Sequence, residues 1–315
     1  MADLSVIIPT YNRKGILLKT LRAYEQQLGH EEILEILVLD DNSVDGTAEA
    51  VMEYSKGTRV PVRYFGLTHR GQAALRNYGI REAQGRLVLF GDDDIVPANC
   101  LVKQHVAWHE KHSDTSVAVL GLVEWAPEVR PTPFMEWLSK DGVLFGFGHL
   151  RAGQEVDARF FYSCNVSLKR SFLIENGVFD EDFRGYGFED TELGFRLSKK
   201  GLRILYNPHA VGYHHKRVSF ADACERAVQV EEARQVLATK EGGIYLAECE
   251  KAQKRPPFSK LRRTVRNGLV PLLAPFKPLL DSRLRLPDRV YRAFYNYYAE
   301  AAAQSVRRKN QGKND

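Results

Sequence analysis

The chain has 315 residues, of which 44% are hydrophobic and 27% charged, so it can bury a sizeable core and is not a disordered protein. No signal peptide is expected in MADLSVIIPTYN, and no apolar run approaches the roughly 20 residues that span a bilayer. The four cysteines form no CxxC pair, which argues against a zinc knuckle or a disulfide framework and favours a cytoplasmic protein. The net charge is a modest +5.

The first hundred residues alternate between apolar strand-like runs and helical patterns. Each run is followed by turn residues, and the last predicted helix is expected to stop at Gly85, a residue type common at helix ends. The predicted strands cover 4–8, 32–41, 60–67 and 86–94, and the predicted helices cover 16–28, 47–57 and 71–85. This alternation predicts an α/β fold with a mostly parallel sheet and helices on both faces.

Acidic side chains follow two of these strands. Asp40 and Asp41 end the second strand, and Asp92, Asp93 and Asp94 end the fourth. Because ligands bind at the carboxyl ends of parallel strands, we expect these acids to meet in one crevice. Neighbouring carboxylates repel one another, so a structural role for the whole set is a poor explanation. Neither G-x-G-x-x-G nor G-x-x-x-x-G-K-[ST] is present, and a carboxylate-held divalent cation is the obvious substitute for binding phosphate.

A second informative block covers residues 163–215. GYGFEDTELGFRLSKKG predicts a helix with Glu189 and Asp190 in its first turn, where favourable interaction with the helix dipole is an alternative to catalysis. LRILYNPHAVGYHH predicts a strand that ends in His214 and His215. A histidine beside a carboxylate site suits metal binding, although a tandem histidine taken alone is more often structural.

Several of these motifs together resemble a known family. SVIIPTYNR, LVLDDNSVDGT, GQAALRNYGIREAQG, FGDDD and GYGFEDTELGFRL occur in the order and spacing of the family 2 glycosyltransferases, over residues 4–216. The resemblance implies the GT-A fold, with a nucleotide-sugar-binding half at 1–100 and an acceptor-binding half at 101–216. Residues 217–315 carry no motif of the family and are expected to form a helical, basic C-terminal extension.

The resemblance also implies a set of donor-binding residues. Pro9, Thr10 and Tyr11 are expected to line the pocket for the nucleotide base. Asp41 is expected to accept a hydrogen bond from the base or ribose, and Arg76 to face the ribose or diphosphate. In LTHRGQAALRN a histidine stands where the family frequently has an asparagine, which affects contacts to the nucleotide rather than the reaction class.

Metal binding is implied at the acidic triplet. Asp92 and Asp94 match the two acids of the family's D-x-D motif, with Asp93 between them and also expected at the donor. His214 matches a position that helps to bind the metal in some members. A magnesium or manganese ion there would stabilise the negative charge that develops on the diphosphate as it leaves.

Catalysis is implied at the start of the predicted helix. Asp190 matches the family's catalytic base, with Glu189 beside it. A single base that deprotonates an acceptor hydroxyl implies direct displacement with inversion at the anomeric carbon. The expected function is therefore metal-dependent inverting transfer from a nucleotide sugar, UDP being the commonest base in the family, to a glycan or lipid-linked acceptor.

Other functions remain open from the sequence. A catalytically silent nucleotide-sugar-binding or scaffold protein would be expected to lose the acids, which are all present here. A sugar nucleotidyltransferase also uses a metal-carboxylate site, but it would not need the Glu189–Asp190 pair. A glycoside hydrolase would not need strand-end acids beside a nucleotide pocket.

The aromatic residues between the two blocks allow two interpretations. Trp125, Trp137, Phe145 and Phe147 would either shape the acceptor side, where sugar faces stack on rings, or form ordinary core.

The C-terminal extension differs in charge from the rest of the chain. Residues 254–315 contain 15 Lys and Arg but 4 Asp and Glu, whereas the rest of the chain has an excess of acids. The stretch 219–248 predicts one or two helices broken by Gly242 and Gly243. The basic segment that follows is either a solvated face, a surface packed on the protein or a second subunit, or a peripheral contact with the inner face of the cell membrane. It has no recognisable nucleic-acid-binding module, so no nucleic-acid partner is expected.

Overall fold

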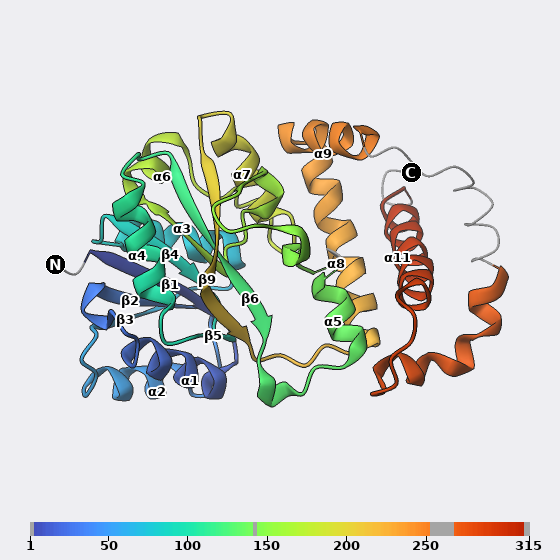
Figure 1. The fold of residues 1–315 in the computed structure, drawn as a ribbon, viewed down its shortest axis with the longest axis horizontal. Helices are drawn as coiled ribbons and strands as arrows, with labels where there is room; N and C mark the ends of the chain where they lie inside the picture. Colours follow the sequence, from blue (N-terminus) through green and yellow to red (C-terminus); the bar gives the residue numbers. More distant parts are fainter. Residues whose placement is uncertain (1–2, 141–143, 253–267, 312–315) are drawn as a thin grey trace. The chain divides into compact units, whose positions relative to one another are not determined.

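A mixed sheet of nine strands organises the part of the chain that this computed structural model describes, residues 3–140, 144–252 and 268–311 (Figure 1). The strand order is β3-β2-β1-β4-β8-β6-β9-β5, and β7 pairs with β9. The strands are β1 Leu4–Thr10, β2 Ile33–Asp40, β3 Val62–Gly66, β4 Leu87–Gly91, β5 Ile95–Pro97, β6 Val117–Trp125, β7 Glu155–Val156, β8 Asn165–Lys169 and β9 Arg203–His214.

The first four strands are parallel and alternate with helices, as the sequence predicts. The connecting helices are α1 Lys14–Glu25, α2 Thr47–Ser55 and α3 Gln72–Glu82. The second half adds antiparallel pairs, of β8 with β4 and β6 and of β5 and β7 with β9, next to one parallel pair, β6 with β9. The predicted α/β fold class is therefore confirmed, with the purely parallel part confined to the N-terminal strands.

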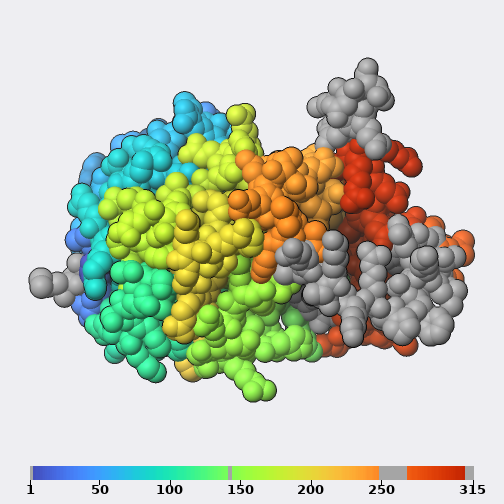
Figure 2. Space-filling model, turned by 90° about the horizontal axis from the view of Figure 1, so that it is seen from above, coloured from blue at the N-terminus to red at the C-terminus, as the bar shows by residue number. Residues whose placement is uncertain are grey.

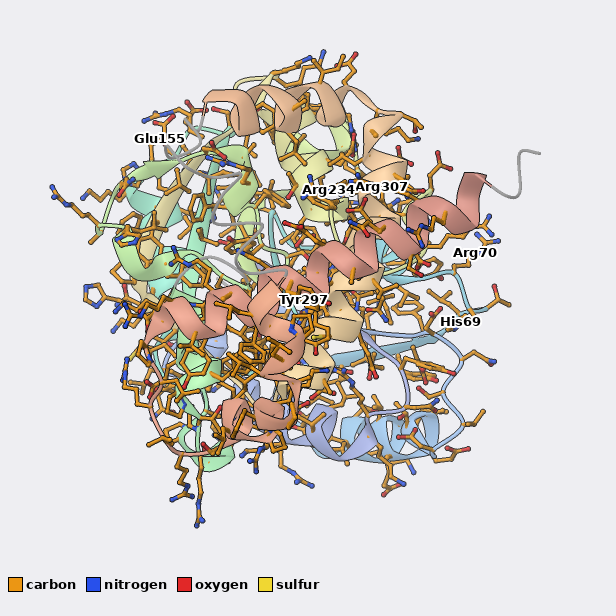
Figure 3. The ribbon with its side chains drawn as sticks, turned by 90° about the vertical axis from the view of Figure 1, so that its right-hand side faces the viewer. His69, Arg70, Glu155, Arg234, Tyr297 and Arg307 are labelled. Carbon is orange, nitrogen blue, oxygen red and sulfur yellow. The ribbon has the colours of Figure 1, made fainter. Side chains whose placement is uncertain are left out.

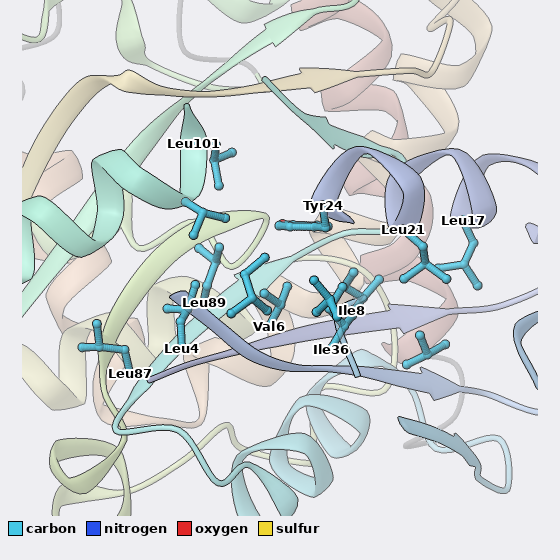
Figure 4. Packing of buried hydrophobic residues seen from close by; sticks show 14 of the residues in the cluster. Leu4, Val6, Ile8, Leu17, Leu21, Tyr24, Ile36, Leu87, Leu89 and Leu101 are labelled. Carbon is cyan, nitrogen blue, oxygen red and sulfur yellow. The ribbon is translucent and has the colours of Figure 1, made fainter. Parts of the chain in front are cut away.

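Both faces of β1 are buried, which explains its continuous apolar run. Val6 and Ile8 belong to a core cluster with Leu17 and Leu21 of α1 (Figure 4). Ile7 points the other way, toward α3, where a Cβ added to Gly79 would lie 2.7 Å from its side chain. Because every interior position packs against a helix, truncating one of these leucines to alanine is expected to cost about 2–5 kcal/mol.

Gly85 has a different role from the one predicted. Helix α3 ends at Glu82, and Ala83 after it has an extended backbone, so Gly85 is not the helix cap. A Cβ at Gly85 would lie 2.7 Å from both the carbonyl oxygen of Asp3 and the amide nitrogen of Ser5. The glycine is needed because the chain entering β4 passes close to the backbone at the start of β1.

The short strand β5 brings the end of β4 next to the end of β9. Ile95 pairs with His214, and the amide of His215 donates to the carbonyl oxygen of Asp94 at 2.8 Å. Strand β8 runs antiparallel to β4, so that Asn165 lies opposite Gly91. This register gathers the carboxyl ends of β1, β4 and β9 at one edge. The helices that accompany these later strands are α4 Leu101–Lys111, α6 Arg170–Asn176 and α7 Glu189–Ser198.

The chain divides into two compact units. The first contains 1–129, 149–184 and 189–216, and the second contains 130–148, 185–188 and 217–315. Figure 2 shows cyan, yellow-green and yellow surfaces of the first unit adjoining one another, so segments far apart in the sequence share one face. The functional division into donor and acceptor halves stays a prediction.

The second unit is helical and has its own aromatic core. Its helices are α5 Pro133–Lys140, α8 Phe220–Ala238, α9 Glu241–Ala252 and α11 Asp288–Gln311, with the 3-10 helix η5 Ala274–Asp281. Phe134 and Trp137 of α5 pack on Tyr291 of α11, and Phe134 also packs on Phe220 of α8. Trp137 is only 3% exposed and is therefore core rather than an acceptor surface.

The predicted helical pair at 219–248 is found, with its break placed differently. Helix α8 ends at Ala238 and α9 begins at Glu241, so Gly242 and Gly243 lie inside the second helix. Glu231 of α8 pairs with Arg234 at 3.6 Å and with Arg307 of α11 at 3.0 Å; both arginines are labelled in Figure 3.

Two findings concern the membrane prediction. Within the described ranges no helix is both long enough and apolar enough to cross a bilayer. Much of the basic stretch predicted to contact a membrane, residues 253–267, lies outside the described residues.

The shorter 3-10 helices are η1 His30–Glu32, η2 Pro127–Val129, η3 Phe147–His149 and η4 Ala158–Phe160.

Candidate active site

The three aspartates after β4 face different partners. Asp92 binds Arg76 of α3, with Oδ1 2.9 Å from Nη2. The Arg76 side chain is only 2% exposed, and its Nη1 lies 3.7 Å from Oε1 of Glu189 at the start of α7. One buried guanidinium therefore joins the acidic end of β4 to the first turn of α7.

Asp93 and Asp94 share a second cation. Nη1 of Arg13, in the loop after β1, lies 2.9 Å from Oδ1 of Asp93 and 2.7 Å from Oδ2 of Asp94. The hydroxyl of Thr10 donates to Oδ2 of Asp93 at 2.8 Å. The hydroxyl of Thr20 in α1 donates to the carbonyl oxygen of Asp93 at 2.7 Å. The mutual repulsion of the triplet is thus offset by two arginines that approach from different elements.

The pKa values of the two neighbouring carboxyl groups are shifted in opposite directions. Burial raises the pKa of Asp93 to about 7, and Arg13 offsets only part of that effect. Burial also disfavours ionised Asp94, but His214, Arg13 and Lys216 outweigh it and hold the pKa of Asp94 at about 2. Asp94 is therefore the carboxylate that stays ionised at neutral pH.

Asp94 and His214 form the part of the site whose chemistry suits a divalent cation. His214 Nε2 lies 3.6 Å from Asp94 Oδ2, and its ring stacks on Trp125 at 5.0 Å with an interplanar angle of 11°. Asp92, the third predicted ligand, is directed to Arg76 instead. Among the described residues no three His, Cys, Asp or Glu side chains gather to hold an ion. The ionised carboxylate fits Mn²⁺ or Mg²⁺ if diphosphate oxygens and water complete the coordination, whereas the imidazole suits the softer Mn²⁺ better than Mg²⁺.

The first turn of α7 holds the predicted base. The amide of Ser163 donates to Oδ2 of Asp190 at 2.9 Å, whereas Oδ1 is buried without a hydrogen-bond partner in the described structure. Burial raises the pKa of Asp190. The pKa of Glu189 is also raised, first by burial and then by the adjacent Asp190. Both carboxyls are therefore better proton acceptors near neutral pH than exposed ones.

Asp41 holds the loop that precedes α3. Its Oδ1 accepts from the amide of Arg70 at 2.9 Å, and its Oδ2 from the amide of Gly71 at 3.3 Å. Nδ1 of His69 lies 3.0 Å from the same Oδ2. His69 and Arg70 are labelled on this loop in Figure 3. The carboxylate thereby fixes His69, which is exposed, beside the end of β1.

The three residues predicted for the base pocket differ in access. Pro9 is buried in β1 opposite Leu39. It lies beyond the residues of β1 that pair with β4, so no hydrogen bond of the sheet is lost because proline has no amide hydrogen. The hydroxyl of Thr10 donates its hydrogen bond to Asp93. Tyr11 is 48% exposed, and its ring lies 5.1 Å from that of His69. Of the three, Tyr11 has the surface on which a base can stack.

Three further residues belong to this site but were not singled out from the sequence. Arg13 stands four residues beyond Pro9 in the motif SVIIPTYNR, and that spacing was a signal for it. His69 was noted only as a departure from the family pattern. Ser163 contributes a backbone amide, for which the side-chain sequence gives no signal.

The chain resembles known proteins in sequence and in fold. The family model described as glycosyl transferase family 2 matches residues 5–173. The chain is 29% identical to an uncharacterized glycosyltransferase, YfnE, of Bacillus subtilis, covering 68% of this chain and 65% of that protein. It is 30% identical to a validoxylamine A glucosyltransferase of Streptomyces hygroscopicus subsp. limoneus, covering 72% and 56%.

A third relative is the GalNAc(5)-diNAcBac-PP-undecaprenol beta-1,3-glucosyltransferase of Campylobacter jejuni. It is 31% identical, with coverage of 61% of this chain and 58% of that protein. The chain thus spans 56% to 65% of the lengths of these three relatives.

Solved structures show the same fold. The mannosyltransferase PcManGT of Pyrobaculum calidifontis, in complex with GDP-Man and Mn²⁺, matches with a TM-score of 0.61 at 20% identity, over 96% of this chain and 86% of that one. Residues 1–349 of TarS from S. aureus match with a TM-score of 0.54 at 18% identity, over 98% and 92%. The predicted GT-A fold is therefore confirmed.

Proposed function

The chain belongs to glycosyl transferase family 2, and from that premise we propose that it transfers a sugar from a nucleotide sugar to an acceptor hydroxyl with inversion. One observation carries the proposal. Arg76 links Asp92, at the predicted donor end, to Glu189, beside the predicted base, across 2.9 Å and 3.7 Å. The acids that would face the leaving diphosphate and the acid that would take the proton therefore belong to one site.

The donor base would stack at the ends of β1 and β2. Tyr11 and His69 present exposed rings there, and Asp41 holds the loop that carries His69. Asp41 already accepts two backbone amides, so any hydrogen bond to the base or ribose would use its remaining acceptor capacity. UDP is the proposed nucleotide; the neighbour from Pyrobaculum binds GDP-Man, which makes GDP the alternative to test.

Asp94 and His214 would hold a divalent cation. Neighbouring structures contain Mn²⁺ with a nucleotide or nucleotide sugar. A bound cation would supply charge stabilisation to the departing diphosphate. Arg13 now occupies Oδ2 of Asp94, so binding would require Arg13 to release that oxygen or the cation to use the other one. Arg76 acts as a positioning residue, because its buried guanidinium orients Asp92 and Glu189.

Asp190 would accept the proton from the acceptor hydroxyl. The Ser163 amide fixes Oδ2, which leaves Oδ1 as the oxygen whose missing hydrogen bond the substrate would provide. Its raised pKa makes the carboxylate a stronger base than an exposed aspartate. Glycans and lipid-linked oligosaccharides are the proposed acceptors, and the Campylobacter relative is named for an undecaprenol-linked one.

A panel of UDP, GDP and dTDP sugars with Mn²⁺ or Mg²⁺, read by thermal shift, would identify the donor, because a ligand that binds the native state raises the melting temperature. With that donor, transfer should release nucleoside diphosphate. Release of pyrophosphate would instead indicate a nucleotidyltransferase, and binding without turnover on any acceptor would indicate a silent binding protein.

Asp94→Ala should abolish the metal-dependent part of the donor-induced shift and leave the metal-independent part. Glu110→Ala, which removes an exposed carboxylate from α4, is the matched control. A full metal-dependent shift in Asp94→Ala would refute the metal assignment.

A further inference from the structure

Exposed apolar side chains are concentrated in one segment of the second unit. Half of the exposed large hydrophobic residues in the described ranges come from 269–284. They are Leu269, Leu272, Leu273, Phe276, Leu279 and Leu284, hereafter the apolar stripe, and they are 41% to 74% exposed. Their spacing of mostly three or four residues follows the helical turn at 268–272 and η5, while Val270 and Leu280 are buried on the inner side. Such a concentration of exposed apolar side chains marks a candidate interaction surface.

An arginine-lined cavity adjoins the end of this stripe. It measures about 480 Å³ and is lined by Arg130, Pro131, Pro133, Glu136, Arg283 and Arg285. Arg285 pairs with Glu136 at 3.2 Å. Arg130 and Arg283 have no acidic partner among the described residues, so the cavity presents two uncompensated guanidiniums.

The stripe and the cavity are continuous along the chain. Leu284, 58% exposed, stands between Arg283 and Arg285. A partner that covers the stripe would therefore also bring its polar groups to the arginines. The partner must combine a large apolar phase with fixed anions, and guanidinium is well suited to bind phosphate.

A second copy of this chain fits the surface poorly. In a two-fold interface the same patch meets itself, which would bring like-charged arginines together around the stripe. Asp281, the acid within the segment, is already used to accept the amide of Phe220 at 2.7 Å. An anionic bilayer satisfies both halves of the surface without that conflict.

We propose that this surface docks on an anionic phospholipid membrane. Headgroup phosphates enter the cavity at Arg130 and Arg283, and the apolar stripe enters the boundary between headgroups and acyl chains. This gives the membrane contact expected for the basic extension a specific location in described residues. It does not depend on the proposed transfer reaction, because it concerns only the second unit.

Vesicle flotation of the full chain tests the proposal. Wild type should bind vesicles of phosphatidylcholine with phosphatidylglycerol and bind pure phosphatidylcholine much less. Arg130→Gln with Arg283→Gln should weaken binding to the anionic vesicles roughly 25-fold, about fivefold per arginine. Leu272→Gln with Phe276→Gln should weaken it by roughly tenfold or more, because two side chains no longer enter the apolar boundary.

Matched controls remove the same number of charges or large apolar side chains at exposed positions elsewhere: Arg59→Gln with Arg151→Gln for the charge, and Leu28→Gln with Ile174→Gln for the apolar residues. These should bind as wild type does. Equal binding to neutral and anionic vesicles, or arginine variants that bind like wild type, would overturn the proposal. The proposal would also be overturned if the wild type did not bind vesicles but formed a dimer in solution, and if Leu272→Gln with Phe276→Gln dissociated that dimer. Failure of sugar transfer would leave these outcomes unchanged.

Discussion

Two polar clusters lie on neighbouring strands, one at the end of β4 and one along β8, and they use polar residues in opposite ways. The first is the acidic triplet with Arg13, Arg76 and His214. The second is a histidine network under α4, made of His105, His109, Asn165 and Ser167. Because Gly91 pairs with Asn165, the two clusters begin at the same rung of the sheet.

The histidine network is neutral and paired within itself except at Nδ1 of His109, which is buried without a hydrogen-bond partner in the described structure. His105 lies 2.9 Å from Asn165 Oδ1 and 2.8 Å from Ser167 Oγ, which His109 also contacts at 2.9 Å. The amide of Asn165 donates to the carbonyl oxygens of Leu122 and Ala210. Burial lowers the pKa of His105 to about 4 and that of His109 to about 2. This cluster holds α4, β8 and β9 together.

The acidic site differs in the kind of group that lacks a partner, which here is a carboxyl group rather than a neutral ring. Oδ1 of Asp190 has no partner in the described structure, and Asp93 and Asp94 depend on a partly exposed arginine. Unsatisfied buried groups cost stability unless a ligand completes them. On the proposed function, the cluster beyond the end of β4 serves binding, whereas the cluster within β8 and under α4 serves folding.

The largest effect is expected at the base. Asp190→Asn should lower the transfer rate about 10²- to 10⁴-fold, because an amide cannot accept the acceptor proton. The donor-induced thermal shift should remain, which separates catalysis from binding. The measurement is release of nucleoside diphosphate under saturating donor. An unchanged rate would place the base elsewhere.

Next comes the loss of the histidine network. His105→Leu keeps much of the volume but removes the partner of Asn165 Oδ1 and one of the two histidine contacts of Ser167 Oγ, so unfolding by urea should show a loss of about 2–4 kcal/mol. His149→Leu, at an exposed position, should change stability by less than about 0.5 kcal/mol. Equal effects of the two changes would mean that the network does not stabilise the fold.

The pH dependence of the network is a smaller effect. In the folded protein the pKa of His105 is lowered to about 4 from its ordinary value of 6.5. At any pH below 6.5 the unfolded chain therefore binds a proton on this histidine more strongly than the folded protein does. Its stabilising contribution is therefore complete above pH 6.5 and is lost as pH falls toward 4, by about 1.4 kcal/mol per pH unit.

Comparing wild type with His105→Gln isolates this group from the other titrating groups, among them Asp93 and Glu189, whose raised pKa values act in the opposite sense. Denaturation at pH 7, 6 and 5 should show the wild type losing stability relative to the variant. Parallel curves would contradict a buried neutral His105.

The smallest effect is expected at an exposed ion pair of the same sheet. Arg203 of β9 lies 2.9 Å from Glu155 of β7, and both side chains are 52% exposed. Arg203→Gln should change the free energy of unfolding by less than about 0.5 kcal/mol, because water screens the pair. A loss as large as that of His105→Leu would show that polarity alone, and not burial, sets the cost.

The sequence alone determined the elements and the edge where the site forms. Apolar runs flanked by turns predicted β1, β2, β3 and β4, and the acids after β2 and β4 predicted where ligands would bind. These predictions rest on local patterns: side-chain periodicity, helix-terminal charge and the residue types at strand ends. The first turn of α7, with Glu189 and Asp190, was predicted for the same reason.

Only the tertiary structure decided which partner each group meets. Arg76, which is predicted to face the ribose or diphosphate, meets Asp92 and Glu189 as its buried partners. Arg13 bridges Asp93 and Asp94 from a loop 80 residues away in sequence. Residues 130–140 and 144–148 fold with the C-terminal helices rather than with the sheet. A hydrophobic or charge pattern states that a side chain will be buried or paired, but the choice of partner depends on contacts between distant segments, which the local pattern does not encode.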